Sequence, residues 1–233
     1  MELYIDAGSG VSTDMLRDAL LDLAAHLPDG AAAGRGAAEH AARQTAALGP
    51  LPAHRSYTAM RSMLLQADLT PATRDTALAV YAALAAAEAE VHGETLETVH
   101  FHEVGRAEAV ANIVAAAAAL ETLNPAGIWV SAVHDGCGTI LCSHGELPVP
   151  VPAVRALQQQ CAYTFVQDDI EMEMVTPGGL AALIGFGAAA VPPERQAALR
   201  KRVEQARRDG RCGVGRGTRD TGRDGLRIYG LLT

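Results

Sequence analysis

Aromatic residues are scarce in this chain, because Phe, Tyr and Trp make up only 4% of its 233 residues. Hydrophobic residues still account for 49% of the chain, so its core has to be built mainly from Ala, Leu and Val. A chain of this length is long enough for one large domain or two small ones. Positive charge is scarce as well, since the formal net charge is −8. That balance argues against nonspecific nucleic-acid binding, which needs clustered cations.

Signals for secretion, membrane insertion and disulfide bonding are also missing from the sequence. Residues 1–4 lack the basic and apolar regions with which a secretion signal begins. The longest apolar runs, residues 113–120 and 180–191, fall short of the ~20 residues that span a bilayer. The 4 cysteines are too few for a disulfide framework, and they lack the C-x-x-C spacing of a zinc ribbon. We therefore expect a cytoplasmic protein that binds no membrane.

Patterns typical of helices and short strands alternate along the chain. The clearest helix is predicted to have Thr70 as its cap, Pro71 at its first position and Gly93 at its end. Residues 28–53 are expected to form a loop or poorly ordered connection, with at most a short helix near 39–47. Apolar spacing and capping residues predict further helices at 12–27, 54–64, 108–123, 153–160 and from 176 onward, and strands at 3–5, 128–133, 140–142 and 226–231. We predict an α/β (α+β) fold in which Ala-rich helices pack on a small mixed β-sheet as a single compact unit over residues 1–233.

A glycine-bearing loop, residues 7–10, follows the first predicted strand and lies between Asp6 and Asp14. Such a loop at the start of a helix brings free N–H groups and the positive helix end together, which favours an anion. It is not a nucleotide fingerprint, since the G-K-[ST] of a P-loop is absent and Thr13 replaces the third glycine of G-x-G-x-x-G. A cation bridging to a phosphate, a bare phosphate and a purely structural turn are all compatible with this pattern.

The most informative run is residues 99–105, in which three metal-capable side chains, His100, His102 and Glu103, occupy four positions. In an extended segment the two histidines share a face, whereas in a helix His100 and Glu103 become neighbours. Imidazole suits nickel, zinc, copper and iron, and a carboxylate adds manganese. The alternative is that one histidine is packed and hydrogen-bonded while the other is solvated.

Two further pairs can bind metal or transfer protons. Glu88 lies on the apolar stripe of the helix after Pro71, and His92 follows four residues later. A carboxylate on a core face is costly unless it is paired, so these residues either form a buried pair or point into a cleft. The alternative is an edge position at which Glu88 reaches water. The second pair is His144 with Cys142, in which the imidazole is a candidate base because it titrates near neutral pH.

Arginines gather near the end of the chain, over residues 195–223. Residues 213–220 within this segment are predicted to form a Gly-rich loop that bears Arg216 and Arg219. Guanidinium groups bind phosphate and carboxylate well, so this loop is a candidate anion contact. A solvated helix face is the commoner explanation of such a basic segment.

These motifs occur in an order that resembles the LarC family of nickel-insertion proteins, and the resemblance extends across most of the chain. The segments that carry it are Asp6 with 9–12 and 14–15, then 54–57, 87–93, 100–105, 138–139, 142–145, 147–150, 176–178 and 217–220. The resemblance implies that nickel is placed into a pyridinium mononucleotide with two thiocarboxylates, forming carbon–nickel and sulfur–nickel bonds. Such a protein is a metal-inserting lyase.

The resemblance also implies roles for particular residues. Metal ligands are expected at His100, His102, Glu103, Glu88 and His92; catalytic residues at His144, Asp6 and Asp14; and contacts to the mononucleotide at Ser9, Gly10, Thr176 and Arg219. In full-length members of the family the reaction is coupled to CTP hydrolysis with a divalent cation such as Mn or Mg.

The chain departs from the family pattern at several positions. Asn112 stands where members usually carry a carboxylate, and Ala7 and Thr13 replace Cys and Gly in the first loop. The chain stops at Thr233, where longer members continue into a C-terminal domain thought to bind CTP, so we expect the N-terminal domain only. A separate polypeptide carrying that domain and a homo-oligomer are both compatible with this. Two alternatives to metal insertion stay open: a nickel-binding or delivery protein without turnover, and a diverged enzyme acting on another small phosphorylated substrate.

Overall fold

The computed structural model describes residues 1–27, 30–49, 55–142, 145–218 and 222–232. Its centre is a mixed sheet of five strands in the order β7-β2-β1-β9-β8. The bounds of these strands are Ala189–Ala190 (β7), Ile128–Val130 (β2), Glu2–Asp6 (β1), Leu226–Leu231 (β9) and Cys212–Gly215 (β8). β1 runs parallel to β2 and antiparallel to β9, and β2 runs parallel to β7. The small mixed sheet predicted from the sequence is confirmed.

Two pairs of short strands accompany the main sheet. β3 (Val133–Asp135) pairs in parallel with β6 (Phe165–Gln167). β4 (Thr139–Cys142) pairs antiparallel with β5 (Gly145–Pro148) and forms a hairpin with it.

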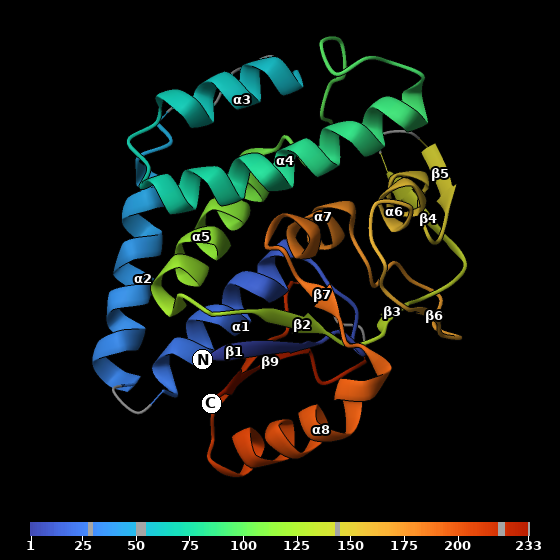
Figure 1. The fold of residues 1–233 in the computed structure, drawn as a ribbon. Helices are drawn as coiled ribbons and strands as arrows, with labels where there is room; N and C mark the ends of the chain where they lie inside the picture. Colours follow the sequence, from blue (N-terminus) through green and yellow to red (C-terminus); the bar gives the residue numbers. More distant parts are fainter. Residues whose placement is uncertain (28–29, 50–54, 143–144, 219–221, 233) are drawn as a thin grey trace.

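Helices cover both faces of the main sheet. Their bounds are Thr13–Ala25 (α1), Gly30–Ala46 (α2), Tyr57–Gln66 (α3), Pro71–His92 (α4), Ala107–Leu123 (α5), Pro152–Gln158 (α6), Pro177–Gly185 (α7) and Pro193–Arg208 (α8). Figure 1 shows α8 on one face and α1 and α7 on the other, with α5, α2 and α4 beyond them and α3 outermost. The β4–β5 hairpin and α6 lie near the C-terminal end of α4 in the same view. The α/β fold class is therefore confirmed.

Alternation along the strands divides the apolar residues between the two faces of the sheet. Leu3 and Ile5 of β1 belong to the main core beneath the helices, whereas Tyr4 packs in a smaller core under α8. In β9, Ile228 faces the main core and Tyr229 faces α8 in the same way. Successive side chains of a strand point to opposite faces, so each strand supplies both cores.

The strand β8 corrects the expectation that residues 213–220 form a loop throughout. Gly213 and Gly215 allow α1 to lie directly on this strand: a Cβ atom at either position would lie 2.0 or 1.9 Å from a carbonyl oxygen of α1. The glycines therefore serve close helix–strand packing over residues 212–215, and only the residues beyond them are left for a loop.

The helix α2 corrects the expectation of a loop or poorly ordered connection over residues 28–53. This helix has 17 residues, where the sequence predicted at most a short helix. Its second half packs on the rest of the protein through Ala37, Ala41 and Gln44, which are buried. Small alanine side chains let α2 lie close to its neighbours, and this tertiary contact compensates for an irregular apolar pattern.

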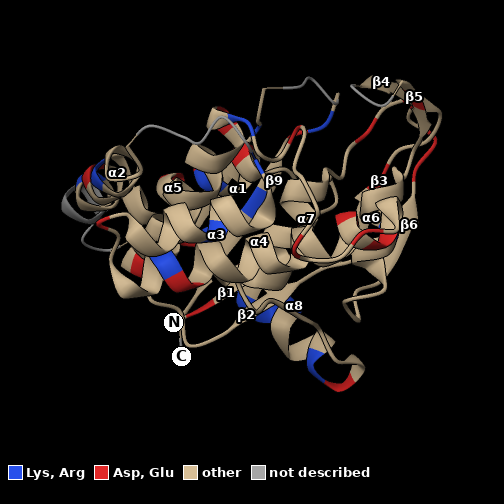
Figure 2. Cartoon of the chain, turned by 90° about the horizontal axis from the view of Figure 1, so that it is seen from above, with Lys and Arg blue, Asp and Glu red and all other residues tan. Residues whose placement is uncertain are grey.

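The predicted ends of the two long helices are confirmed. α4 begins at Pro71 and ends before Gly93, which adopts φ 65°, and α5 ends before Asn124, which adopts φ 42°. None of the described helices combines the length and apolar character needed to cross a membrane. Figure 2 shows that α7 and the middle of α4 carry almost no charged residues, as expected for helices that pack within the molecule.

Candidate ligand-binding cleft

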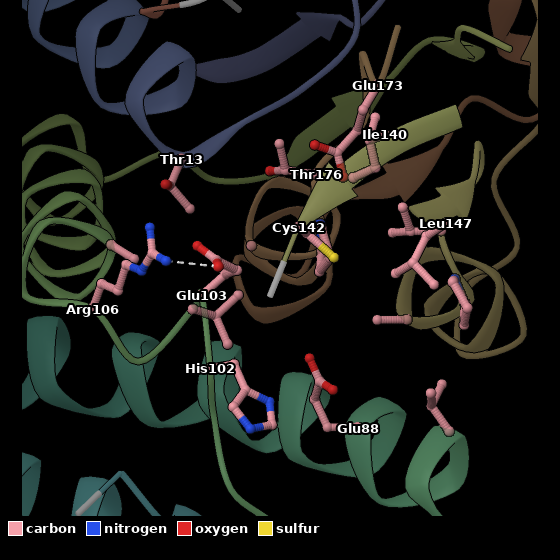
Figure 3. A pocket seen from close by; sticks show the side chains of 18 of the residues that line it. Thr13, Glu88, His102, Glu103, Arg106, Ile140, Cys142, Leu147, Glu173 and Thr176 are labelled. Atoms are coloured by element: carbon pink, nitrogen blue, oxygen red, sulfur yellow. Dashed lines mark hydrogen bonds and ion pairs between the residues drawn. The ribbon is translucent and has the colours of Figure 1, made fainter. Parts of the chain in front are cut away.

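A large cavity of about 940 Å³ opens between the C-terminal end of α4, the β4–β5 hairpin and the first turns of α5, α6 and α7. A small cavity of about 230 Å³ lies between the first turns of α1 and α5 and residues 216–218. The residues that line both cavities are Thr13, Glu103, Arg106, Ala109, Glu173 and Thr176. The two cavities therefore adjoin one another along these residues and are together called the cleft, part of which is drawn in Figure 3.

The amino ends of α1, α5, α6 and α7 meet at this cleft. The first turn of a helix carries partial positive charge and unpaired N–H groups, which favours anions. Ser12 and Thr176 cap α1 and α7 with their side-chain oxygens. Arg106, the N-cap residue of α5, makes no such side-chain bond. The cleft thus combines anion-favouring helix ends with the acidic and histidine side chains described below.

Glu88 and His92, four residues apart on α4, both line the large cavity. The Glu88 Oε2 and His92 Nε2 atoms are 3.4 Å apart, and the Glu88 side chain is only 13% exposed. The His102 ring lies edge-on to the His92 ring, with 6.1 Å between the ring centroids. Figure 3 shows Glu88 and His102 facing the same space. Glu88 and His92 thus lie close enough to pair and also line the cleft, so the pair and the cleft position that the sequence offered as alternatives occur together.

Buried neighbours hold His102 at the cleft, although His102 itself is exposed. Phe101 packs against the rings of Tyr57 and Tyr81, with centroid distances of 6.2 and 5.4 Å. The Tyr81 hydroxyl donates a hydrogen bond of 3.1 Å to the Val104 carbonyl oxygen, and burial raises the pKa of Tyr81. These contacts fix the backbone on both sides of His102.

His100 does not reach the cleft, although it lies only two residues from His102. It forms an antiparallel bridge with Ser56, is exposed, and is absent from the lining of both cavities. The chain bends at His102, so the alternation of an extended strand does not continue through the motif. Within residues 1–27, 30–49, 55–142, 145–218 and 222–232, no three His, Cys, Asp or Glu side chains are close enough to hold a metal ion together.

Glu103 lines both cavities and pairs with Arg106, whose Nη2 lies 2.8 Å from Glu103 Oε1. Cys142 at the end of β4 lines the large cavity, and Figure 3 shows its sulfur atom facing into it. The predicted site residues His144 and Arg219 lie outside the residues that the structure describes.

The first glycine loop does not line the cleft, since Asp6, Ser9 and Gly10 are not among the described residues that line either cavity. Its N–H groups are largely used within the protein. Gly8 N–H donates to Asp6 Oδ1 at 3.2 Å, and Gly10 N–H donates to the Ala7 carbonyl oxygen at 3.1 Å. Val11 N–H donates to the Met174 carbonyl oxygen at 2.9 Å. The geometry is that of a structural turn, one of the alternatives that the sequence allowed.

Asp14 lines the small cavity and holds the loop of residues 216–218. Its Oδ2 accepts the Thr218 N–H at 2.8 Å and the Thr218 hydroxyl at 3.1 Å, while its Oδ1 accepts bonds from Met15 and Ser12. Burial alone would raise the pKa of Asp14, but these hydrogen bonds from Ser12, Thr218 and Met15 lower it below its ordinary value. Asp14 therefore remains an anion that fixes this wall of the cleft.

Several polar residues of the cleft were not predicted from the sequence as site residues, among them Glu173, Arg106 and Asn112. Glu173 lines both cavities and is only 6% exposed. Asn112 lines the small cavity, and its amide oxygen accepts a hydrogen bond from Arg17. Arg216, on the loop predicted as an anion contact, lines the same cavity. Residues 168–175 contain four acidic residues, so no local signal distinguished Glu173.

The sequence of the chain is similar to those of known proteins. A family model described as "Nickel insertion protein" matches residues 3–228. A relative from Acetivibrio thermocellus, named "Pyridinium-3,5-bisthiocarboxylic acid mononucleotide nickel insertion protein", is 38% identical over 144 residues, which cover 62% of this chain and 33% of that protein.

Two other relatives carry the name "Putative nickel insertion protein". The one from Synechococcus elongatus is 40% identical over 141 residues, covering 60% of this chain and 35% of that protein. The one from Roseiflexus castenholzii is 33% identical over 230 residues, covering 85% of this chain and 58% of that protein. The chain thus spans between a third and three fifths of the length of these relatives. No solved structure matches it.

Proposed function

The chain belongs to the nickel insertion protein family, and we propose that its cleft places nickel into a pyridinium mononucleotide with thiocarboxylates at ring positions 3 and 5. The ligand class comes from the name of the Acetivibrio thermocellus relative. Nickel is a substrate of this reaction, and the protein acts as a metal-inserting lyase.

The observation that carries the proposal is the division of the cleft into two ends of different chemistry. The large cavity offers the nitrogen and oxygen donors of Glu88, His92 and His102. The small cavity offers Arg216 and the first turns of α1 and α5, which favour a phosphate. Carboxylates line this cavity as well, namely Asp14, Glu103, Glu108 and Glu173, so the phosphate has to bind beside Arg216 and the helix ends. A pyridinium mononucleotide has the same two ends, because its sulfur-bearing ring edge lies opposite the ribose and the phosphate.

Transfer of nickel requires that donors of the protein and donors of the substrate bind the metal together. The large cavity offers protein donors of this kind, such as Glu88 and His92. A site that performs chemistry on a bound metal keeps coordination positions open for the substrate. We propose that the two sulfur atoms of the mononucleotide fill these positions and draw nickel toward the ring.

Formation of the carbon–nickel bond requires a base. Ring carbon 4 lies between positions 3 and 5, so nickel held by both sulfur atoms lies against that carbon. The new bond replaces the hydrogen on carbon 4, which leaves as a proton. We propose that His144 takes this proton, since imidazole is half-protonated near neutral pH. The relatives are longer than this chain. We propose that CTP and a second divalent cation bind to the part of the relatives that this chain does not span, whether that part belongs to the same polypeptide or to a separate one.

Nickel binding to single-histidine variants tests the proposed metal end. We expect His102→Ala and His92→Ala to weaken nickel binding by roughly tenfold or more, because each removes a donor from the large cavity. His100→Ala is the matched control and is expected to bind nickel like the wild type, because His100 lines neither cavity. Isothermal titration with nickel, checked by elemental analysis after gel filtration, measures this.

If His100→Ala and His102→Ala lost nickel affinity equally, the assignment of the large cavity as the nickel site would be refuted. The second step of the test adds the synthetic mononucleotide, CTP and magnesium, with the C-terminal part of a longer relative supplied in trans. Metallation is followed by absorption and mass spectrometry. Tight nickel binding without any metallated product would favour a delivery protein over an enzyme.

A further inference from the structure

We propose that Glu173 recognises the positive charge of the pyridinium ring, and that Asp135 positions the segment that carries it. The cleft would thereby select cationic pyridinium mononucleotides over mononucleotides whose ring is neutral. This inference rests on the proposed function, because it concerns the same cleft and ligand.

The first argument is the place of Glu173 along the cleft. It lines both the large and the small cavity, so it lies where the two meet. In a pyridinium mononucleotide the ring nitrogen also lies in the middle, between carbon 4 at the metal end and the ribose phosphate at the other end. A ligand bound with its ends as proposed therefore brings the cationic ring nitrogen toward Glu173.

The second argument is burial. The other acidic residue shared by both cavities, Glu103, has a side chain that is 44% exposed. Glu173 is 6% exposed. The energy of a charge pair rises as water is excluded, so a buried carboxylate discriminates a cation from a neutral ring more strongly than an exposed one does.

The third argument is the composition of the cleft wall. Proteins commonly recognise organic cations by stacking them on Phe, Tyr or Trp. None of these three residue types is found among the described residues that line either cavity. Recognition of the ring charge is therefore left to carboxylates, and the described carboxylates of the cleft are Asp14, Glu88, Glu103, Glu108 and Glu173.

Asp135 holds the segment that follows Glu173. It is the last residue of β3 and is 3% exposed. Its Oδ1 accepts the N–H groups of Met174 and Val175 at 3.0 Å each, and that of Gly136 at 2.9 Å. On the other side, Val11 N–H donates to the Met174 carbonyl oxygen at 2.9 Å. The backbone next to Glu173 is thus held by hydrogen bonds to Asp135 on one side and to Val11 on the other.

The second carboxylate oxygen of Asp135 provides a conservative test. Oδ2 is buried and accepts no hydrogen bond from any described residue, and burial raises the pKa of Asp135. Asp135→Asn keeps the oxygen that accepts the Met174 and Val175 N–H groups, and it breaks no hydrogen bond at Oδ2. Asp135→Ala removes both of these hydrogen bonds.

Binding of two probes that differ in ring charge tests the proposal without any turnover. The probes are nicotinamide mononucleotide, whose ring is cationic, and its reduced form, whose dihydropyridine ring is neutral. We expect the wild type to prefer the cationic probe and Glu173→Gln to lose roughly 10- to 100-fold in affinity for it. Affinity for the neutral probe should change little. Glu171→Gln is the matched control, since Glu171 is exposed two residues earlier.

The results of this titration separate failure of the present inference from failure of the proposed function. Equal binding of both probes by the wild type, or an intact preference in Glu173→Gln, overturns the inference, while nickel insertion remains testable. Failure of the wild type to bind either probe counts against both this inference and the proposed function. We expect Asp135→Asn to keep the preference and Asp135→Ala to lose it, with circular dichroism confirming that each variant is folded. Loss in both Asp135 variants alike would overturn the positioning role.

Discussion

Single glycine residues decide how closely the segments around the cleft approach one another. Gly10 adopts φ 83°, and a Cβ atom there would lie 2.2 Å from the Met174 carbonyl oxygen. A Cβ atom on Gly179 would lie 2.3 Å from the carbonyl oxygen of Val11. These two positions bring the start of α1, the start of α7 and the residue after Glu173 together. The first glycine loop therefore contributes to the cleft by packing, although it does not line it.

Gly10→Ala tests this role of the first loop. We expect the free energy of unfolding to fall by at least about 1–2 kcal/mol, because an L-residue is strained at positive φ and the new methyl group meets backbone. Thermal unfolding followed by circular dichroism measures the change. Gly36→Ala in α2 is the control: no atom lies within 4 Å of the new Cβ, and a helical alanine should stabilise by roughly 0.5–1 kcal/mol. Unchanged stability in Gly10→Ala would contradict the packing argument.

At the scale of elements, one half-buried carboxylate connects three helices. Glu121 Oε2 on α5 accepts hydrogen bonds from the hydroxyls of Thr70 and Thr73, at 2.5 and 2.6 Å. The His40 Nε2 atom of α2 lies 3.0 Å from the same oxygen. Thr70 was expected to cap α4, but it makes no side-chain cap bond and directs its hydroxyl to Glu121 and Gln44 instead. Contact between helices has replaced local capping here.

Thr73→Val tests the contribution of this connection. Thr73 is fully buried, and the substitution removes a donor to a carboxylate while keeping the side-chain shape. We expect unfolding at neutral pH to become easier by about 1–2 kcal/mol. Urea unfolding of wild type and variant measures the difference. Thr58→Val in the exposed first turn of α3 is the control and should change little.

The same connection predicts a dependence of stability on pH. Burial alone would raise the pKa of Glu121, but hydrogen bonds from Thr70, Thr73 and His40 lower it below its ordinary value. A lowered pKa in the folded protein stabilises it above the unfolded value of about 4.3, and this contribution is lost as the pH falls through the folded value. The gap between wild type and Thr73→Val should therefore narrow below about pH 4. A gap that stays constant down to pH 3 would contradict this.

At the scale of the whole molecule, the last strand unites the two cores. β9 lies between β1 and β8, and its register pairs Glu2 with Leu231 and Asp6 with Arg227. Figure 1 shows the two ends of the chain side by side as a result. Ile228 supplies the core under the helices, while Tyr229 supplies the core under α8. The fold is thus completed only when both ends of the sequence have met.

Removal of residues 226–233 is therefore expected to prevent folding. It would expose the edges of β1 and β8 and remove apolar residues from both cores, which a small sheet cannot replace. Far-ultraviolet circular dichroism and limited proteolysis measure the outcome, with a chain shortened only by residues 232–233 as control. A protease-resistant, cooperatively unfolding fragment without β9 would contradict the expectation.

The sequence alone determined features that depend on neighbouring residues. The limits of α4 follow from Pro71 and Gly93, and the end of α5 follows from Asn124, because φ preferences act within a single turn. The small mixed sheet also followed from patterning, since the largely apolar residues 3–5 and 226–231 are typical of strands that are covered on both faces. The family resemblance rested on motifs of this local kind.

Only the tertiary structure decided which residues share the cleft. His100 and His102 are equivalent by spacing, but the buried Phe101 and the bend after it bring only His102 to the large cavity. Glu173 looks like one more acid in its segment. Asp135 and Val11 hold the backbone of the residues that follow it, and this keeps Glu173 where the two cavities meet. Burial and proximity are set by residues far away in the chain, and no local pattern of side chains contains that information.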